Sequence, residues 1–252
     1  MQPDLSRARE VHAIAMAKPD LIVSWFWTKR IPSSVLTIAP GFGVHPSLLP
    51  RHRGPDPYFW TVDSGDEMAG VTAHVLDAEY DTGDMLGRKS IRVEGGWSAW
   101  TLAKKLDTPS LALLREVASA YAAGTPPTRE AQDERFATLA PTPTDDELEL
   151  NWKLSAIDLA RRIRAASPYP GAFAFFGDQV VTMVRAEPTC QFPLVLAVGE
   201  AAVVDGCALV RCGDGALRLL EGRIDDDPRE TPLSASDLAS LISSMTAPVP
   251  IA

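Results

Sequence analysis

A stretch rich in proline, threonine and acidic residues, 128–149, separates two parts of the chain with different hydrophobic patterns. Before it, apolar runs of strand length alternate with helical stretches, which is typical of an α/β sheet covered by helices. After it, short apolar runs are bounded by Gly or Asp turns, which indicates a small β-barrel or sandwich. The pattern therefore predicts an α/β domain over 1–127, a linker over 128–149 and a β-rich domain over 150–252.

The composition predicts a soluble protein. Hydrophobic residues make up 46% of the 252 residues, enough for a buried core. The chain has no run of about 18 uncharged apolar residues, and charges interrupt the first twenty residues, where a secretory signal needs an apolar stretch. We therefore expect a cytoplasmic protein with no membrane partner. The net charge of −9 gives no general footprint for nucleic acid, although total charge does not report on a local basic patch.

The three cysteines are Cys190, Cys207 and Cys212. An odd number with this spacing fits neither a disulfide framework nor a CxxC metal site, so we expect buried or idle thiols and no metal.

The segment 43–54, GVHPSLLPRHRG, is the most unusual local sequence in the first part. Its prolines fix φ and remove two backbone donors, so we expect a shaped loop rather than a helix or a central strand. The apolar stretches 20–27 and 33–42 before it predict strands, or a strand and a short helix. Within the loop, residues 51–53 (Arg-His-Arg) could meet an anionic substrate such as a phosphate, with a solvated basic turn as the alternative.

Three residues of the first part could carry acid–base chemistry. His45 lies in the proline-rich segment, His74 in the alternating stretch GVTAHVLD, and Asp81 shortly after it. A histidine can accept and return a proton near neutral pH, and a carboxylate beside it holds its tautomer. The alternative is a satisfied core histidine beside a solvated Asp-Thr-Gly turn.

Several segments together resemble the folate-dependent formyltransferase family, which includes methionyl-tRNA formyltransferases and amino-sugar N-formyltransferases. They occur in the order of the family and are HPSLLPRHRG, GVTAHVLDAEYDTGDML, AQDERFATLAP, SPYPGAFAF and CGDGALRLLEG. The resemblance implies an α/β fold with a Rossmann-like catalytic domain, followed by a small OB-like β-barrel domain. It also implies transfer of a formyl group from 10-formyltetrahydrofolate to a primary amine, from initiator Met-tRNA or a nucleotide amino sugar.

The resemblance also assigns residues. It implies that His45 and Asp81 are catalytic, and that Ser47, Leu48, Leu49 and Gly43 are candidate contacts of the folate donor. Packing within the loop is an equal explanation for the serine and the two leucines. The family has an asparagine at the position of Gly43, and that amide is thought to hold the formyl oxygen. Deleting one such donor typically lowers the rate by about 10²–10³.

Alternatives to an active transferase remain. Family members carry further sequence before the strand expected at 20–27, and the absence of a central strand would expose a sheet edge that a homodimer could cover. A catalytically impaired relative that binds folate or a partner is therefore the other function class. As to the acceptor, 141–252 holds sixteen acidic and nine basic residues, which weakens the tRNA reading because phosphate contacts need Lys and Arg.

Overall fold

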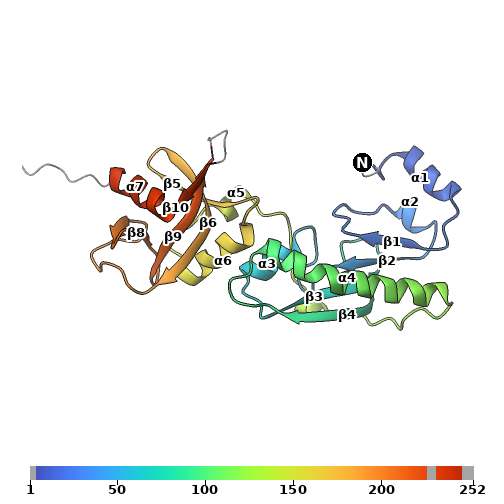
Figure 1. The fold of residues 1–252 in the computed structure, drawn as a ribbon. Helices are drawn as coiled ribbons and strands as arrows, with labels where there is room; N and C mark the ends of the chain where they lie inside the picture. The colour runs from blue at the N-terminus through green and yellow to red at the C-terminus, as the bar shows by residue number, and fades with distance from the viewer. Residues whose placement is uncertain (1–3, 226–230, 246–252) are drawn as a thin grey trace, which may run out of the picture. The chain divides into compact units, whose positions relative to one another are not determined.

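The computed structural model describes residues 4–225 and 231–245, which form two compact units. Most of the first unit ends at Thr142, and the main part of the second begins at Pro143. Figure 1 shows both units and labels most of their elements. Those up to residue 136 are α1 (Ala8–Met16), β1 (Ile22–Trp25), α2 (Ser33–Leu36), β2 (Gly41–His45), α3 (Pro57–Asp63), β3 (Met68–Val75), β4 (Met85–Arg92), α4 (Ala99–Ala122) and the short 3₁₀ helix Glu134–Phe136.

The first unit is built on a four-stranded mixed sheet in the order β1-β2-β3-β4. The β1–β2 pair is parallel, whereas β2–β3 and β3–β4 are antiparallel. The two central strands are almost entirely buried, as expected for strands covered on both faces. β1 lies at the edge, and its Val23 and Trp25 are exposed. The sequence expectation of an α/β fold is confirmed, with only one parallel pair among the described strands.

The long helix α4 packs against this sheet along one stripe. Its buried residues recur every three or four positions, the spacing of one helix face; they are Leu102, Leu106, Ser110, Leu113 and Val117. The Ser110 hydroxyl accepts a 2.9 Å hydrogen bond from the indole of Trp25 on β1, and Tyr121 stacks on Phe42 of β2. The helix therefore holds the first two strands together.

One expectation about the segment 43–54 is wrong. Gly43, Val44 and His45 are not loop residues but the end of β2, a central strand. The prolines do not prevent this because the first of them, Pro46, comes directly after the strand ends. The loop proper begins at Pro46, and His45 is held by its pairing with Thr72 of β3, directly after Val44, which pairs with Trp25 of β1.

The second unit is an antiparallel sheet with two flanking helices. Its strands run in the order β5-β6-β9-β8-β7, with β10 added on β9. α6 packs against β6, and α7 packs against β8 and β9. The elements are α5 (Asp145–Leu148), α6 (Ala156–Ala166), β5 (Ala172–Phe176), β6 (Gln179–Thr189), β7 (Ala201–Val204), β8 (Cys207–Arg211), β9 (Ala216–Ile224), β10 (Pro232–Ser234) and α7 (Ala235–Met245).

The expected β-rich second part is confirmed, but no closed barrel is found. Among the described residues no pairing joins β5 to β7, which are the two ends of the strand order. Alternating hydrophobicity predicts strands, whereas closure depends on strand tilt and shear, which that pattern does not report.

The segment that follows α4 belongs to the first unit up to Thr142. The backbone of Arg53 pairs with Thr138 and Ala140, and Met85 pairs with Glu130. The predicted boundaries of a linker over 128–149 stay a prediction. No helix in the described ranges is long and apolar enough to cross a membrane.

Candidate active site

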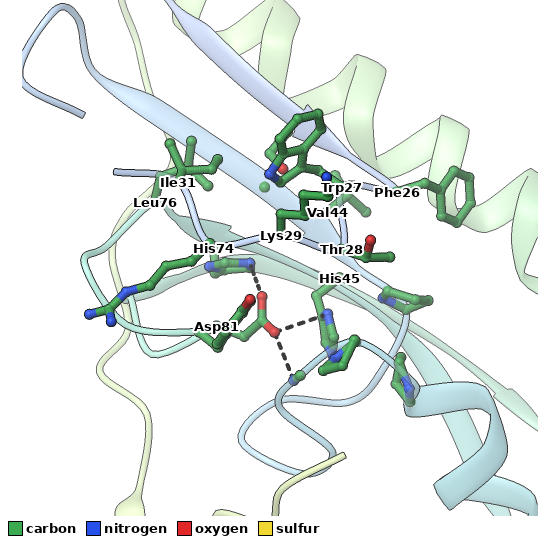
Figure 2. A pocket seen from close by; sticks show the side chains of 18 of the residues that line it. Phe26, Trp27, Thr28, Lys29, Ile31, Val44, His45, His74, Leu76 and Asp81 are labelled. Carbon is green, nitrogen blue, oxygen red and sulfur yellow. Dashed lines mark hydrogen bonds and ion pairs between the residues drawn. The ribbon is translucent and has the colours of Figure 1, made fainter. Parts of the chain in front are cut away.

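A pocket of about 820 Å³, part of it open to solvent, lies beside the centre of the first sheet. Figure 2 shows its side chains. The ends of β1, β2 and β3, the loops that follow them and the start of α3 contribute its walls. His45, His74 and Asp81 all line this pocket, so the structure brings together the three residues that the sequence suggested for acid–base chemistry.

Asp81 lies between the two histidines. Its Oδ2 is 3.4 Å from Nδ1 of His45, and its Oδ1 is 3.3 Å from Nε2 of His74. Figure 2 draws both contacts. The side chains of both histidines are buried, and Asp81 is 16% exposed. A carboxylate and two imidazoles therefore share one small volume that is largely shielded from water.

His45 is fixed by strand and loop together. It is the last residue of β2, and its Nε2 donates a 2.7 Å hydrogen bond to the backbone carbonyl of His52. The loop that follows β2 and contains His52 is held against the sheet by Thr72 of β3. The Thr72 hydroxyl donates to the carbonyl of Ser47 and accepts from the amide of Leu49. Burial lowers the pKa of His45 below its usual 6.5, although the charge of Asp81 acts in the opposite direction. His45 is therefore neutral at pH 7 and able to accept a proton.

Asp81 is fixed by backbone contacts. It has a left-handed backbone, with φ of 54°, and its Oδ2 accepts a 2.9 Å hydrogen bond from the amide of Gly54. The side-chain amide of Gln132 donates to the carbonyls of Asp81 and Gly83, which holds the turn. Burial alone would raise the pKa of Asp81, but the charges that the two histidines carry when protonated, together with the Gly54 amide, lower it below 3.8. The carboxylate is therefore ionised at neutral pH.

Comparison with known proteins identifies the family. Residues 2–118 match the formyl transferase family model, and residues 144–240 match the model of the formyl transferase C-terminal domain. The chain is 33% identical over 244 residues to a methionyl-tRNA formyltransferase of Geobacter metallireducens, which covers 94% of this chain and 75% of the relative. The chain belongs to the formyl transferase family.

A second relative and two solved structures agree. A methionyl-tRNA formyltransferase of Caldanaerobacter subterraneus is 33% identical over 206 residues, which is 81% of this chain and 66% of the relative. The crystal structure of HypX from Aquifex aeolicus in complex with tetrahydrofolic acid has a TM-score of 0.69 at 22% identity, over 98% of this chain but 42% of HypX. An N-formyltransferase from Helicobacter canadensis, in complex with folinic acid and dTDP-3-aminofucose, has a TM-score of 0.61 at 14% identity over 77% of this chain and 70% of that chain. At these identities the two structures show a shared fold.

The basic residues 51–53 all have acidic partners within the first unit. Arg51 and His52 both contact Asp66, at 2.6 and 2.8 Å. Arg53 is buried and pairs with Glu134 at 2.8 Å. All three serve to hold the loop that carries the His52 carbonyl, because their partners lie on other parts of the first unit.

The predicted folate contacts separate into two groups. Gly43 lines the pocket beside His45. Ser47, Leu48 and Leu49 are not among its lining residues: Ser47 is buried and donates to the carbonyl of Arg51, Leu49 is fully buried, and Leu48 lines a second pocket. Their packing shows how they shape the loop, and a role in donor binding stays a prediction.

Other residues of the site were not predicted. Gln132 holds the Asp81 turn from 51 residues away, and only its place in the motif AQDERFATLAP marked it. Phe26, Trp27 and Lys29 line the pocket after β1, and no sequence signal distinguished them. All three cysteines are free, and within the described ranges no group of three or more His, Cys, Asp or Glu is arranged to hold a metal.

Proposed function

We propose that this protein transfers a formyl group from 10-formyltetrahydrofolate to a primary amine. The observation that carries the proposal is the pairing of a neutral, buried His45 with an ionised Asp81 at a pocket, in a member of the formyl transferase family. Relatives that act on methionyl-tRNA by name, and folate complexes of structural neighbours, support the same chemistry.

The pocket has the properties that a folate donor requires. It is partly open to solvent and is lined by both apolar side chains and the polar groups of His45, His74 and Asp81, as small-molecule sites usually are. Phe26, Trp27 and Leu76 give it an apolar wall. The buried indole Nε1 of Trp27 has no hydrogen-bond partner among the described residues, so an acceptor atom of a ligand would satisfy it. We propose that this wall holds the pterin.

The protein's own groups then act on the proton. When bound, 10-formyltetrahydrofolate supplies the formyl carbon, at which a bond to the amine forms and the bond to N10 breaks. His45 accepts through Nδ1 the proton that the attacking amine loses, and the proton returns to the leaving nitrogen. Asp81 orients the ring of His45 and stabilises its charged form. Gly43 contributes no side-chain donor to the developing negative charge on the formyl oxygen.

For the acceptor, we propose initiator Met-tRNA, because the two curated relatives at 33% identity are methionyl-tRNA formyltransferases. A nucleotide amino sugar is the second candidate. The excess of acidic over basic residues in 141–252 favours it, since tRNA phosphates bind to Lys and Arg. In the pocket, Lys29 is exposed and has no ion-pair partner in the described part, so it can meet an anionic acceptor.

The test measures formyl transfer by purified protein with 10-formyltetrahydrofolate, against initiator Met-tRNA and a panel of nucleotide amino sugars. We expect His45→Ala to lower kcat/KM by about 10²–10⁴, the usual contribution of a general base. His12→Ala is the matched control, since His12 is exposed on α1, and it should leave the rate unchanged. No turnover with any acceptor would refute the activity and favour an impaired relative. Full activity of His45→Ala would refute the assigned base.

A further inference from the structure

His74 is the buried titratable group that the proposed mechanism leaves unused. It lies on β3, directly opposite Gly43 of β2, and its side chain is 5% exposed. Its ring is perpendicular to that of His45, with centroids 6.5 Å apart. Because both rings reach the same carboxylate from two different strands, the protonation of each affects the other.

Backbone carbonyls determine which nitrogen of each ring carries its proton. A carbonyl oxygen can only accept, so a ring nitrogen bonded to it must be the donor. The carbonyl of His52 accepts from Nε2 of His45 at 2.7 Å, and the carbonyl of Val75 accepts from Nδ1 of His74 at 3.0 Å. In its neutral form, each ring therefore presents a bare nitrogen to Asp81.

The distances to Asp81 agree with bare nitrogens. Nδ1 of His45 and Nε2 of His74 lie 3.4 and 3.3 Å from the carboxylate oxygens. A charge-assisted hydrogen bond from a protonated nitrogen would be about 2.7–2.9 Å long. The contacts of the other two ring nitrogens with the backbone carbonyls are shorter, at 2.7 and 3.0 Å. The ring protons are therefore better placed on the nitrogens that face the carbonyls.

We propose that His74 is a second proton acceptor of this site, and that a proton taken up from the amine is shared between His45 Nδ1, Asp81 and His74 Nε2. The inference deepens the proposed formyl transfer and rests on it. One added proton turns the repulsion between a carboxylate and a facing lone pair into attraction, and the carboxylate connects both rings. Asp81, which both rings reach, thereby stabilises the added proton that burial of His45 would otherwise disfavour.

Other ionisable groups around the two rings must be kept constant in the test. They come from the loop after β1, the loop after β2, α3 and the loop after β3, and they are Lys29, Arg30, His52, Tyr58, Asp77 and Glu79. Arg30 and Glu79 pair with each other, and His52 pairs with Asp66. Apart from His52, which is replaced only to assign its NMR signal, none of these is changed in the variants below.

The first experiment reads the protons without any substrate. Nitrogen NMR of the full chain, labelled at the histidine rings, assigns the four histidines from single His→Gln variants. At pH 8 we expect protons on Nε2 of His45 and on Nδ1 of His74, and on acidification a coupled titration of the two rings. In His74→Gln, His45 should titrate in a single step. A proton on Nε2 of His74 at pH 8, or independent titration, would overturn the proposal.

The second experiment separates this role from a structural one. We expect His74→Gln to lower kcat by about tenfold to a hundredfold, less than the loss of the primary base, with KM nearly unchanged and the acid limb of the pH–rate profile shifted. His12→Gln serves as control. A loss of kcat that follows only a loss of folded protein, with the pH profile unmoved, would overturn the proposal. Because the NMR experiment needs no turnover, failure of the proposed activity is distinguishable from failure of this inference.

Discussion

Gly43 lies at the centre of the site, and replacing it with alanine tests how tightly the site is packed. Gly43 pairs with Ser24 of β1 and His74 of β3. An added Cβ would lie 3.0 Å from Nε2 of His74 and 3.3 Å from Cδ2 of Leu76. Both contacts are closer than ordinary van der Waals distances of about 3.5–4.0 Å. The ring of His74 cannot yield freely, because the Val75 carbonyl holds it.

The expected magnitude follows from two opposing terms. Overpacking a close-packed core costs about 1–3 kcal/mol. Replacing glycine inside a strand recovers about 0.5–1 kcal/mol of backbone entropy. We therefore expect Gly43→Ala to lower the free energy of unfolding by about 0.5–2 kcal/mol. It should also lower kcat, because the added methyl group would displace the ring of His74.

Urea unfolding measures the change in stability, provided that the m value, the slope of the unfolding free energy against urea concentration, is unchanged. The formyl-transfer assay measures the change in kcat. Gly95→Ala is the matched control: its added Cβ meets nothing within 4 Å, so its stability should stay within about 0.5 kcal/mol of the parent. A Gly43→Ala protein as stable and as active as the parent would refute the packing argument. Gly43→Asn, which carries a larger side chain into the same space, should be less stable than Gly43→Ala.

Three further predictions follow from the first unit. Burial lowers the pKa of His45, so the unfolded chain binds this proton more readily and the free energy of unfolding falls as the pH drops below about 6.5. His45→Gln should flatten that part of a stability–pH curve. An unchanged slope would count against a lowered pKa of His45. Leu106→Ala on α4, a fully buried position, should cost about 2–5 kcal/mol in urea unfolding, whereas a cost below 1 kcal/mol would contradict the packing of α4 on the sheet. Lys29→Ala should raise KM for an anionic acceptor about two- to fivefold with kcat unchanged, and steady-state kinetics showing an unchanged KM would remove Lys29 from the acceptor site.

Much of the fold was readable from local patterns. The apolar stretch 20–27 contains β1, and 98–124 contains α4. The alternating stretch 70–76 overlaps β3 from residue 70 to residue 75. These elements are determined by the periodicity of apolar residues and by residues that start or end a helix or strand, both of which act over a few positions. The motif segments also led to the correct family, which the family models confirm.

The sequence by itself therefore determined the elements, the family and the candidates His45, His74 and Asp81. Only the tertiary structure decided that His45 ends a central strand, that both histidines reach one carboxylate, and that the Arg51 and Arg53 charges are used internally. The reason is that these facts depend on strand register, and a one-residue slip would turn His74 to the other face of the sheet. Register is set by packing between segments that are distant in the sequence, so a local pattern does not determine which residues come into contact.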